Sequence, residues 1–182
     1  MTTTPMDPLE TAAGAPETRA TPLPARDELL IRGACVVTMD DQLGELPRAD
    51  VHIRDGRIID VADSLPDPGC EVIDGTGRIV LPGFVDPHWH LWNSVLRGLI
   101  DHTPERSYFP VKHALGPRFR PGDTYRSTRL ALAEAVTGGI TTVHDWDHNV
   151  RSPADAAASI RAHLDSGLRV RFGYGTPDGL AA

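Results

Sequence analysis

Apolar, β-prone runs start after an N-terminal leader rich in threonine, proline and alanine. They lie within 29–39, 51–61 and 71–81, and a turn at Asp40-Asp41 and a loop rich in proline and glycine at 65–69 separate them. The dipeptide Asp55-Gly56 interrupts the middle run, and it favours a two-residue hairpin because both central positions of a type I′ turn need positive φ. We predict a small antiparallel β-sandwich unit over residues 27–82.

The pattern changes after Pro82-Gly83, where strands and helices begin to alternate. We predict a short buried strand at 84–86, a long loop with short helical pieces over 91–122, and strands at 140–145 and 168–174. Strands that alternate with helices at this spacing are typical of βαβ units with a parallel sheet.

Two helices are predicted between these strands. The first spans about 124–137, and Asp123 has the residue type of a good N-cap. Its expected apolar stripe contains Tyr125, Leu132, Ala133 and Val136. The second follows Ser152-Pro153-Ala154-Asp155, which combines an N-cap, a proline at the first helical position and an acid three residues after the cap. The large apolar residues of this helix are Ile160 and Leu164.

Composition narrows the class of protein. The chain has 182 residues, of which 40% are hydrophobic and 24% charged, as in a globular domain with a core. Residues 1–26 show no helical or strand period, so we expect a flexible leader there. The two cysteines, Cys35 and Cys70, form no Cys-x-x-Cys motif, which argues against a disulfide framework and a thiolate zinc site.

Charge and hydropathy limit the expected partners and location. The formal net charge is -7 and the basic residues are scattered, so nucleic acid and anionic membrane surfaces are poor partners. The sequence contains no apolar stretch long enough to span a bilayer, and its N-terminus lacks the pattern of a secretory signal. We therefore expect no membrane association and a cytoplasmic location.

The feature that carries chemistry is His88-Trp89-His90, directly after the predicted strand at 84–86. Side chains alternate along a strand, so residues two apart point to the same face. Both imidazoles can then reach one point while Trp89 turns away, as a pair of metal ligands requires. Because many surface strands contain His-x-His by chance, the context of the pair decides its meaning.

That context is a specific run of residues, Leu81-Pro82-Gly83-Phe84-Val85-Asp86-Pro87-His88-Trp89-His90. It follows Val72-Ile73-Asp74-Gly75-Thr76-Gly77 and precedes Gly139-Ile140-Thr141-Thr142-Val143. This order resembles the amidohydrolase superfamily, and in particular its cytosolic deaminases and triazine chlorohydrolases. The resemblance extends from about residue 29 to the C-terminus.

The resemblance implies a (β/α)₈ barrel beside a small β-sandwich, with residues 83–182 forming the first three βα units. His88 and His90 would lie at the C-terminal mouth of the first barrel strand and bind one divalent metal, with zinc favoured over iron. A metal-bound hydroxide would then hydrolyse a C–N or C–Cl bond of a small nitrogen heterocycle. Trp92 and Asn93 would line the mouth of the substrate pocket, although packing of the loop accounts for Trp92 equally well.

The resemblance also implies ligands on the fifth, sixth and eighth barrel strands, which have no counterpart before Ala182. A complete barrel takes about 250 residues, so we assign no catalytic residue to this chain. Open apolar faces and a free sheet edge predict association with further copies or with a complementary C-terminal chain. The alternative hypothesis is a truncated relative, or half of a split enzyme, that acts only as an assembly or binding module.

Other polar residues fit roles other than direct metal binding. The cluster His144-Asp145-Trp146-Asp147-His148 looks metal-like, but alternation on a strand favours pocket lining or hydrogen bonding over direct ligation. Arg97 suits a surface salt bridge better than substrate binding, and Asp86 suits a role in local backbone geometry. The remaining histidines fit no ligand spacing and are predicted to be solvated: His52, His102, His113 and His163.

Overall fold

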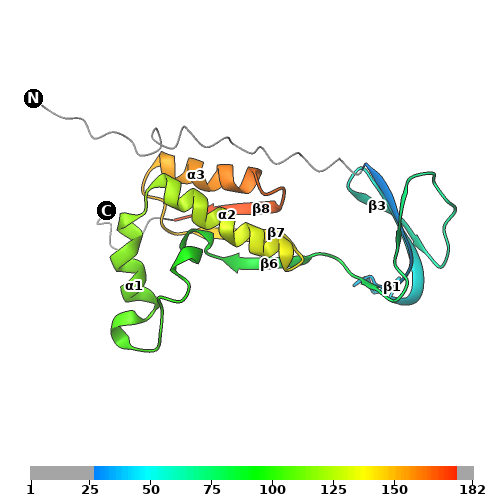
Figure 1. The fold of residues 1–182 in the computed structure, drawn as a ribbon, viewed down its shortest axis with the longest axis horizontal. Helices are drawn as coiled ribbons and strands as arrows, with labels where there is room; N and C mark the ends of the chain where they lie inside the picture. The colour runs from blue at the N-terminus through cyan, green and yellow to red at the C-terminus, as the bar shows by residue number, and fades with distance from the viewer. Residues whose placement is uncertain (1–26, 176–182) are drawn as a thin grey trace, which may run out of the picture. The chain divides into compact units, whose positions relative to one another are not determined.

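The computed structural model describes residues 27–175, which form two compact units that meet in sequence at Leu81 and Pro82. Figure 1 shows a unit made only of strands and a unit in which helices cover a sheet. The leader predicted at 1–26 lies outside the described residues. Within those residues, no helix is both long and apolar enough to cross a membrane.

The first unit is one five-stranded sheet built around β1 (Glu28–Val37). On one side β1 pairs with β2 (Glu45–Arg54), which pairs in turn with β3 (Arg57–Ala62), and both pairings are antiparallel. The β2–β3 turn has φ of 51° at Asp55 and 70° at Gly56. Positive φ at both positions confirms the hairpin turn predicted from this dipeptide.

The other side of β1 corrects the prediction of an antiparallel sandwich. Both β4 (Glu71–Asp74) and β5 (Ile79–Val80) pair with β1 in parallel, so the sheet is mixed, and the described strands form one sheet instead of two. The segment 63–70 carries the chain from β3 to the opposite edge, where β4 enters in the direction of β1. Alternation of apolar residues does not encode strand direction, which is why the sequence pattern missed this feature.

Asp50 joins three parts of this sheet. Its carboxylate accepts hydrogen bonds from the backbone N–H of Gly33 at 2.8 Å and of Leu65 at 3.0 Å, and it lies 3.6 Å from the Arg32 guanidinium. Gly33 has φ of 71° and lies within a register shift between β1 and β2. The buried Asp50 therefore holds an irregular point of β1 and the 63–70 segment together.

The second unit confirms the predicted βαβ arrangement. Its parallel sheet has the order β6 (Phe84–Trp89), β7 (Ile140–Asp147), β8 (Arg169–Tyr174). The helices α2 (Pro121–Thr137) and α3 (Pro153–Leu164) connect these strands and lie on the same side of them in Figure 1. Shorter helices fill the segment after β6: η1 (Leu91–Leu96), η2 (Pro104–Arg106), α1 (Tyr108–Leu115) and η3 (Gly116–Arg118).

Helix α2 differs from its prediction at both its start and its buried face. Arg120 occupies the N-cap, and Asp123 is the third helical residue, whose carboxylate accepts the Arg120 backbone N–H in a capping box. The buried face consists of smaller residues: Thr124, Ser127, Thr128, Ala131, Leu132 and Ala135. Ala133 and Val136, which belong to the expected apolar stripe, are exposed.

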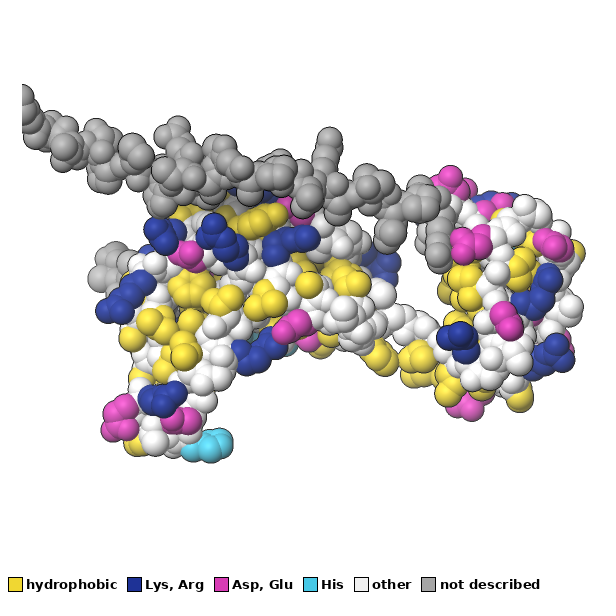
Figure 2. Space-filling view, viewed as in Figure 1, with side chains coloured by type: hydrophobic (Ala, Val, Ile, Leu, Met, Phe, Trp, Pro, Cys, Tyr) yellow, Lys and Arg dark blue, Asp and Glu magenta, His cyan; other side chains and the backbone are white. Residues whose placement is uncertain are grey.

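Helix α3 begins as predicted, with the Ser152 hydroxyl accepting the Asp155 backbone N–H. Its large apolar residues, Ile160 and Leu164, point to the surface. The buried face carries Ala158, Ser159, Ala162 and His163 instead. Figure 2 shows hydrophobic side chains among basic ones over α2 and α3.

The strand predicted to be buried at 84–86 is exposed. Phe84 is 55% and Val85 is 64% exposed, because β6 is an edge strand that pairs only with β7 among the described residues. The core of the unit lies between the sheet and α2, where Leu91, Ala131, Leu132, Ala135 and Val143 form one buried cluster.

Candidate metal centre

His88 and His90 bring two imidazole nitrogens together at the end of β6. Their Nε2 atoms lie 3.2 Å apart, and the two rings meet nearly at right angles. Asp86 of β6 pairs with Val143 of β7, and the next pair is Trp89 with Asp145. Between these pairs β6 advances by three residues and β7 by two, so β6 carries one extra residue at this point. Such a bulge also accommodates Pro87, which has no N–H for the sheet.

Backbone contacts orient both histidines. His90 Nδ1 lies 2.6 Å from the carbonyl oxygen of Trp146, and a carbonyl only accepts, so Nδ1 carries the proton and the Nε2 lone pair is available. The backbone N–H of His88 donates to the Asp86 carboxylate at 3.0 Å. This bond confirms the role in local geometry predicted for Asp86.

The pair fits a zinc-like ion. Two nitrogen ligands of a tetrahedral zinc, each about 2.0–2.1 Å from the metal, lie about 3.3 Å apart. The observed separation of 3.2 Å between the Nε2 atoms is close to that value. A metal-binding histidine usually binds the metal through one ring nitrogen and donates the N–H of its other ring nitrogen to a carbonyl or carboxylate, as His90 does through Nδ1. Within residues 27–175, no group of three or more His, Cys, Asp or Glu side chains could hold a metal ion.

The polar cluster at the end of β7 divides between two faces of the strand, as alternation predicts. Asp145 and Asp147 are buried, whereas Trp146 is 42% exposed. The His144 Nδ1 lies 3.1 Å from the carbonyl oxygen of Pro87, which links β7 to the bulge of β6. Gly173 of β8 makes room for the Trp146 side chain, because a Cβ at position 173 would come within 2.8 Å of the Trp146 ring.

Asp145 forms a buried junction beneath the histidine pair. Its carboxylate accepts the backbone N–H of Leu91, the residue after His90, at 3.2 Å and lies 2.9 Å from His163 Nε2. His163 is only 7% exposed, so the prediction that it is solvated is wrong. His163 lies four residues after Ser159, on the same buried face of α3.

Asp147 connects the end of β7 to α3. Its carboxylate accepts the Ser159 hydroxyl at 2.7 Å and the Asn149 backbone N–H at 3.0 Å. Burial raises the pKa of Asp147 above its ordinary value, and these two hydrogen bonds oppose the rise only in part. The turn that follows β7 is therefore fixed from its buried side.

His148 contacts one of the two candidate ligands, His90, although its place in the cluster did not single it out. Its ring stacks on that of His90, with centroids 4.2 Å apart and planes 22° from parallel. Its Nδ1 accepts the indole N–H of Trp92 at 2.9 Å, and its Nε2 lies 3.0 Å from the Tyr108 hydroxyl. Nothing in the local sequence pattern indicates these contacts, which join segments 40 and 56 residues apart.

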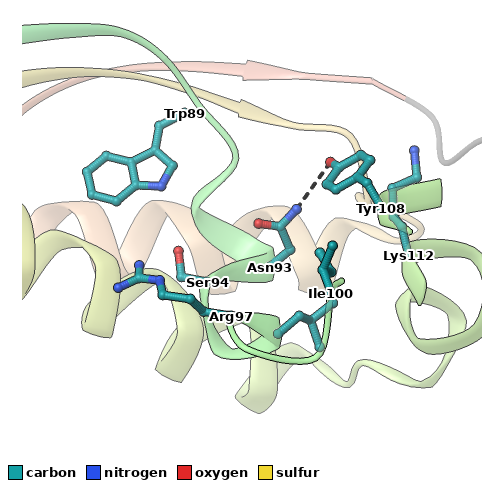
Figure 3. A pocket seen from close by; sticks show the side chains of 8 residues that line it. Trp89, Asn93, Ser94, Arg97, Ile100, Tyr108 and Lys112 are labelled. Atoms are coloured by element: carbon teal, nitrogen blue, oxygen red, sulfur yellow. Dashed lines mark hydrogen bonds between the residues drawn. The ribbon is translucent and has the colours of Figure 1, made fainter. Parts of the chain in front are cut away.

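The two predicted substrate contacts lie in different environments. Trp92 is fully buried and meets Phe119 edge to face, so it packs the loop. Asn93 lines a cavity of about 190 Å³, and Figure 3 shows its amide directed at the Tyr108 hydroxyl. The other lining residues are Trp89, Ser94, Leu96, Arg97, Ile100, Tyr108 and Lys112.

The cavity has polar groups on its η1 side. The Ser94 hydroxyl is buried and, within the described residues, makes no hydrogen bond. Arg97 is exposed and bonds the Glu134 carboxylate at 2.7 Å, which confirms the surface salt bridge. Tyr108 connects the cavity wall to His148, because its hydroxyl contacts both Asn93 and His148.

Comparison with known proteins identifies similar sequences. Residues 79–179 match the amidohydrolase family. The chain is 30% identical over 148 residues to the 5'-deoxyadenosine deaminase of Methanosarcina acetivorans, covering 78% of this chain and 33% of that protein. It is 35% identical over 147 residues to the 5-methylthioadenosine/S-adenosylhomocysteine deaminase of Symbiobacterium thermophilum, covering 79% and 32%. The chain thus spans about a third of the length of the curated relatives that it matches.

Solved structures show a similar fold. The atrazine chlorohydrolase TrzN from Arthrobacter aurescens TC1, in complex with zinc, superposes with a TM-score of 0.70 at 30% identity. The superposition covers 80% of this chain and 35% of that protein. A molinate hydrolase matches with a TM-score of 0.56 at 26% identity, over 80% of this chain.

Proposed function

The chain belongs to the amidohydrolase family, and on this premise we propose that His88 and His90 are the first two ligands of a divalent metal centre. The proposed reaction is hydrolysis of a C–N or C–Cl bond on a small nitrogen heterocycle. The observation that carries the proposal is the 3.2 Å separation of the two Nε2 atoms, with His90 oriented through its Nδ1. Zinc is the favoured metal, since one solved relative contains it, and iron is the alternative.

The residues of this chain have distinct parts in the proposed chemistry. When bound, the metal supplies the Lewis acidity that activates water near neutral pH. His88 and His90 hold it, and the carbonyl oxygen of Trp146 keeps the His90 Nε2 lone pair available. Asn93, whose amide both donates and accepts hydrogen bonds, stays the proposed substrate contact, whereas Trp92 supports the site from within the core.

The relatives support the substrate class. Their names describe removal of an amino group from adenosine derivatives and of chlorine from a triazine. In both cases the leaving group stands on a carbon of a nitrogen heterocycle, so one activated water serves either reaction. We propose that this chain contributes to a site of that class, with residues 83–182 as the first three βα units of a barrel.

The alternative function is an assembly or binding module, and the exposed β6 edge favours it. Phe84 and Val85 are mostly exposed, as is Tyr174 on the other edge strand, β8. We expect the chain to associate with copies of itself or with a complementary chain that completes the barrel. A clean monomer in analytical ultracentrifugation would argue against association, and turnover by the purified chain alone would exclude the assembly module.

Metal binding tests the proposed function directly. We expect about one zinc ion per chain, measured by competition with a chromophoric chelator. A four-ligand zinc site is worth about 10–16 kcal/mol, so one ligand contributes roughly 3 kcal/mol. His88→Ala and His90→Ala should each weaken binding by about a hundredfold. His88 is exposed, so its removal should leave folding unchanged.

The matched control is His102→Ala, which removes another exposed histidine of the second unit that does not belong to the pair. It should bind zinc as the unaltered chain does. Absence of zinc binding by the unaltered chain, or equal affinity in all four proteins, would refute His88 and His90 as ligands.

A further inference from the structure

The turn that carries His148 is held on both sides. Asp147 before it bonds Ser159 of α3, and Asn149 after it donates to the Gly116 carbonyl at 3.1 Å. Both flanking residues are buried. Two anchors at i−1 and i+1 leave the His148 backbone little freedom, so its side chain starts from a defined position.

One tautomer of His148 satisfies its two hydrogen bonds. The indole N–H of Trp92 can only donate, so the His148 Nδ1 that it meets at 2.9 Å carries no proton. In the neutral ring the proton is then on Nε2, which donates to the Tyr108 hydroxyl at 3.0 Å. The ring is therefore fixed in both rotation and tautomer.

The fixed ring lies against a face of His90. The two imidazoles are nearly parallel, with centroids 4.2 Å apart. In this arrangement the His148 nitrogens point along the plane of its own ring, toward Trp92 and Tyr108. His148 therefore packs against His90 and does not share its Nε2 direction, while the Trp146 carbonyl holds the Nδ1 end of the same ring.

We propose that His148 is a positioning residue for His90, locked by Trp92 and Tyr108, and that it sets the direction of the His90 Nε2 lone pair. The proposal rests on the proposed function, in which His90 is a metal ligand. Hydrogen bonding through Nδ1 leaves the ring free to swing about that bond, and the stack against His148 removes this freedom. A partner of this kind is typically worth about 10–100-fold in metal affinity.

Imidazole nitrogen NMR tests the proposal in the metal-free chain. For the neutral imidazole rings we expect a single Nε2–H tautomer for His148 and a single Nδ1–H tautomer for His90. Trp92→Phe, which keeps an aromatic ring but removes the donor, should produce a mixture of tautomers at His148. An unchanged single tautomer at His148 in Trp92→Phe would overturn the locking role of the indole.

Zinc affinity tests the effect on the ligand. We expect His148→Ala to weaken zinc binding by about 10–100-fold, and His148→Phe, which retains the stacked ring, to weaken it less. Fluorescence of the three tryptophans, all in the second unit, reports whether each variant is folded. If His148→Ala is unfolded, the comparison of His148→Phe with His148→Gln decides instead, because only the phenylalanine can stack.

The outcomes separate this inference from the proposed function. Zinc binding that His90→Ala weakens but His148 substitutions leave unchanged would refute the positioning role and retain the ligands. A chain that binds no zinc would refute the ligands. In that case, His90 imidazole signals that stay as narrow in His148→Ala as in the unaltered chain would also refute the positioning role, whereas broadening by ring motion would support it.

Discussion

Asp145→Ala is expected to lower the free energy of unfolding of the second unit by about 3–5 kcal/mol. The carboxylate is fully buried between the Leu91 backbone N–H and His163 Nε2. Removing it leaves both groups buried without their partner, and desolvated polar groups are costly when unpaired. Since Leu91 follows His90, the same change should loosen the end of β6 that carries the histidine pair.

Tryptophan fluorescence during urea unfolding measures this effect, because Trp89, Trp92 and Trp146 all belong to the second unit. Asp145→Asn keeps an acceptor for the Leu91 N–H and should lose less stability than the alanine variant. Glu105→Ala, which removes an exposed acid of the same unit, is the control and should change the free energy of unfolding by less than about 0.5 kcal/mol. If Asp145→Ala is as stable as this control, Asp145 does not stabilise the second unit through its buried hydrogen bonds.

Asp50→Ala is expected to destabilise the first unit by about 2–4 kcal/mol. Its loss leaves the backbone N–H groups of Gly33 and Leu65 without acceptors and removes the ion pair with Arg32. Arg32 is 40% exposed, so the two backbone bonds account for most of the effect. The first unit contains no Phe, Trp or Tyr, and hydrogen exchange in peptides from residues 28–54 is the suitable measurement. If Asp50→Ala does not change hydrogen exchange in those peptides, this role of Asp50 is refuted.

The same residue makes the first unit sensitive to acid. Burial raises the pKa of Asp50, but the N–H groups of Leu65 and Gly33 and the Arg32 charge outweigh it and hold the pKa below its ordinary value. A carboxyl group whose pKa is lower in the folded protein than in the unfolded chain stabilises the folded state. This stabilisation is complete above the unfolded pKa of about 3.9, and it is lost as the pH falls through the pKa of the folded state. Asp50→Asn should therefore be the less stable protein at pH 7, and the difference should shrink toward pH 3. A difference that stays constant with pH would refute this contribution.

Features that depend on a few neighbouring residues were predictable. Positive φ at Asp55 and Gly56 follows from the dipeptide, and the Ser152 cap follows from its hydroxyl and the acid three residues later. The parallel sheet of the second unit follows from the alternation of strands and helices. In each case the physical cause acts within a few residues, so the sequence pattern contains it.

Features that depend on which elements meet were not predictable in the same way. Strand direction in the first sheet depends on where the chain returns, and alternation is the same for either direction. The buried face of α3 is selected by Asp145 and Asp147 of β7, which bond His163 and Ser159. These polar partners turn the large apolar residues of the helix outward, against the expectation from hydrophobicity.

By itself, the sequence determined the family and the spacing of His88 and His90, because the run that contains them is specific and residues two apart meet on one side of a strand. Only the tertiary structure determined what orients the pair. The Trp146 carbonyl and His148 reach His90 across more than fifty residues of sequence, since β6 and β7 lie side by side. Contacts of this length are made by the packing of elements, and no local pattern encodes them.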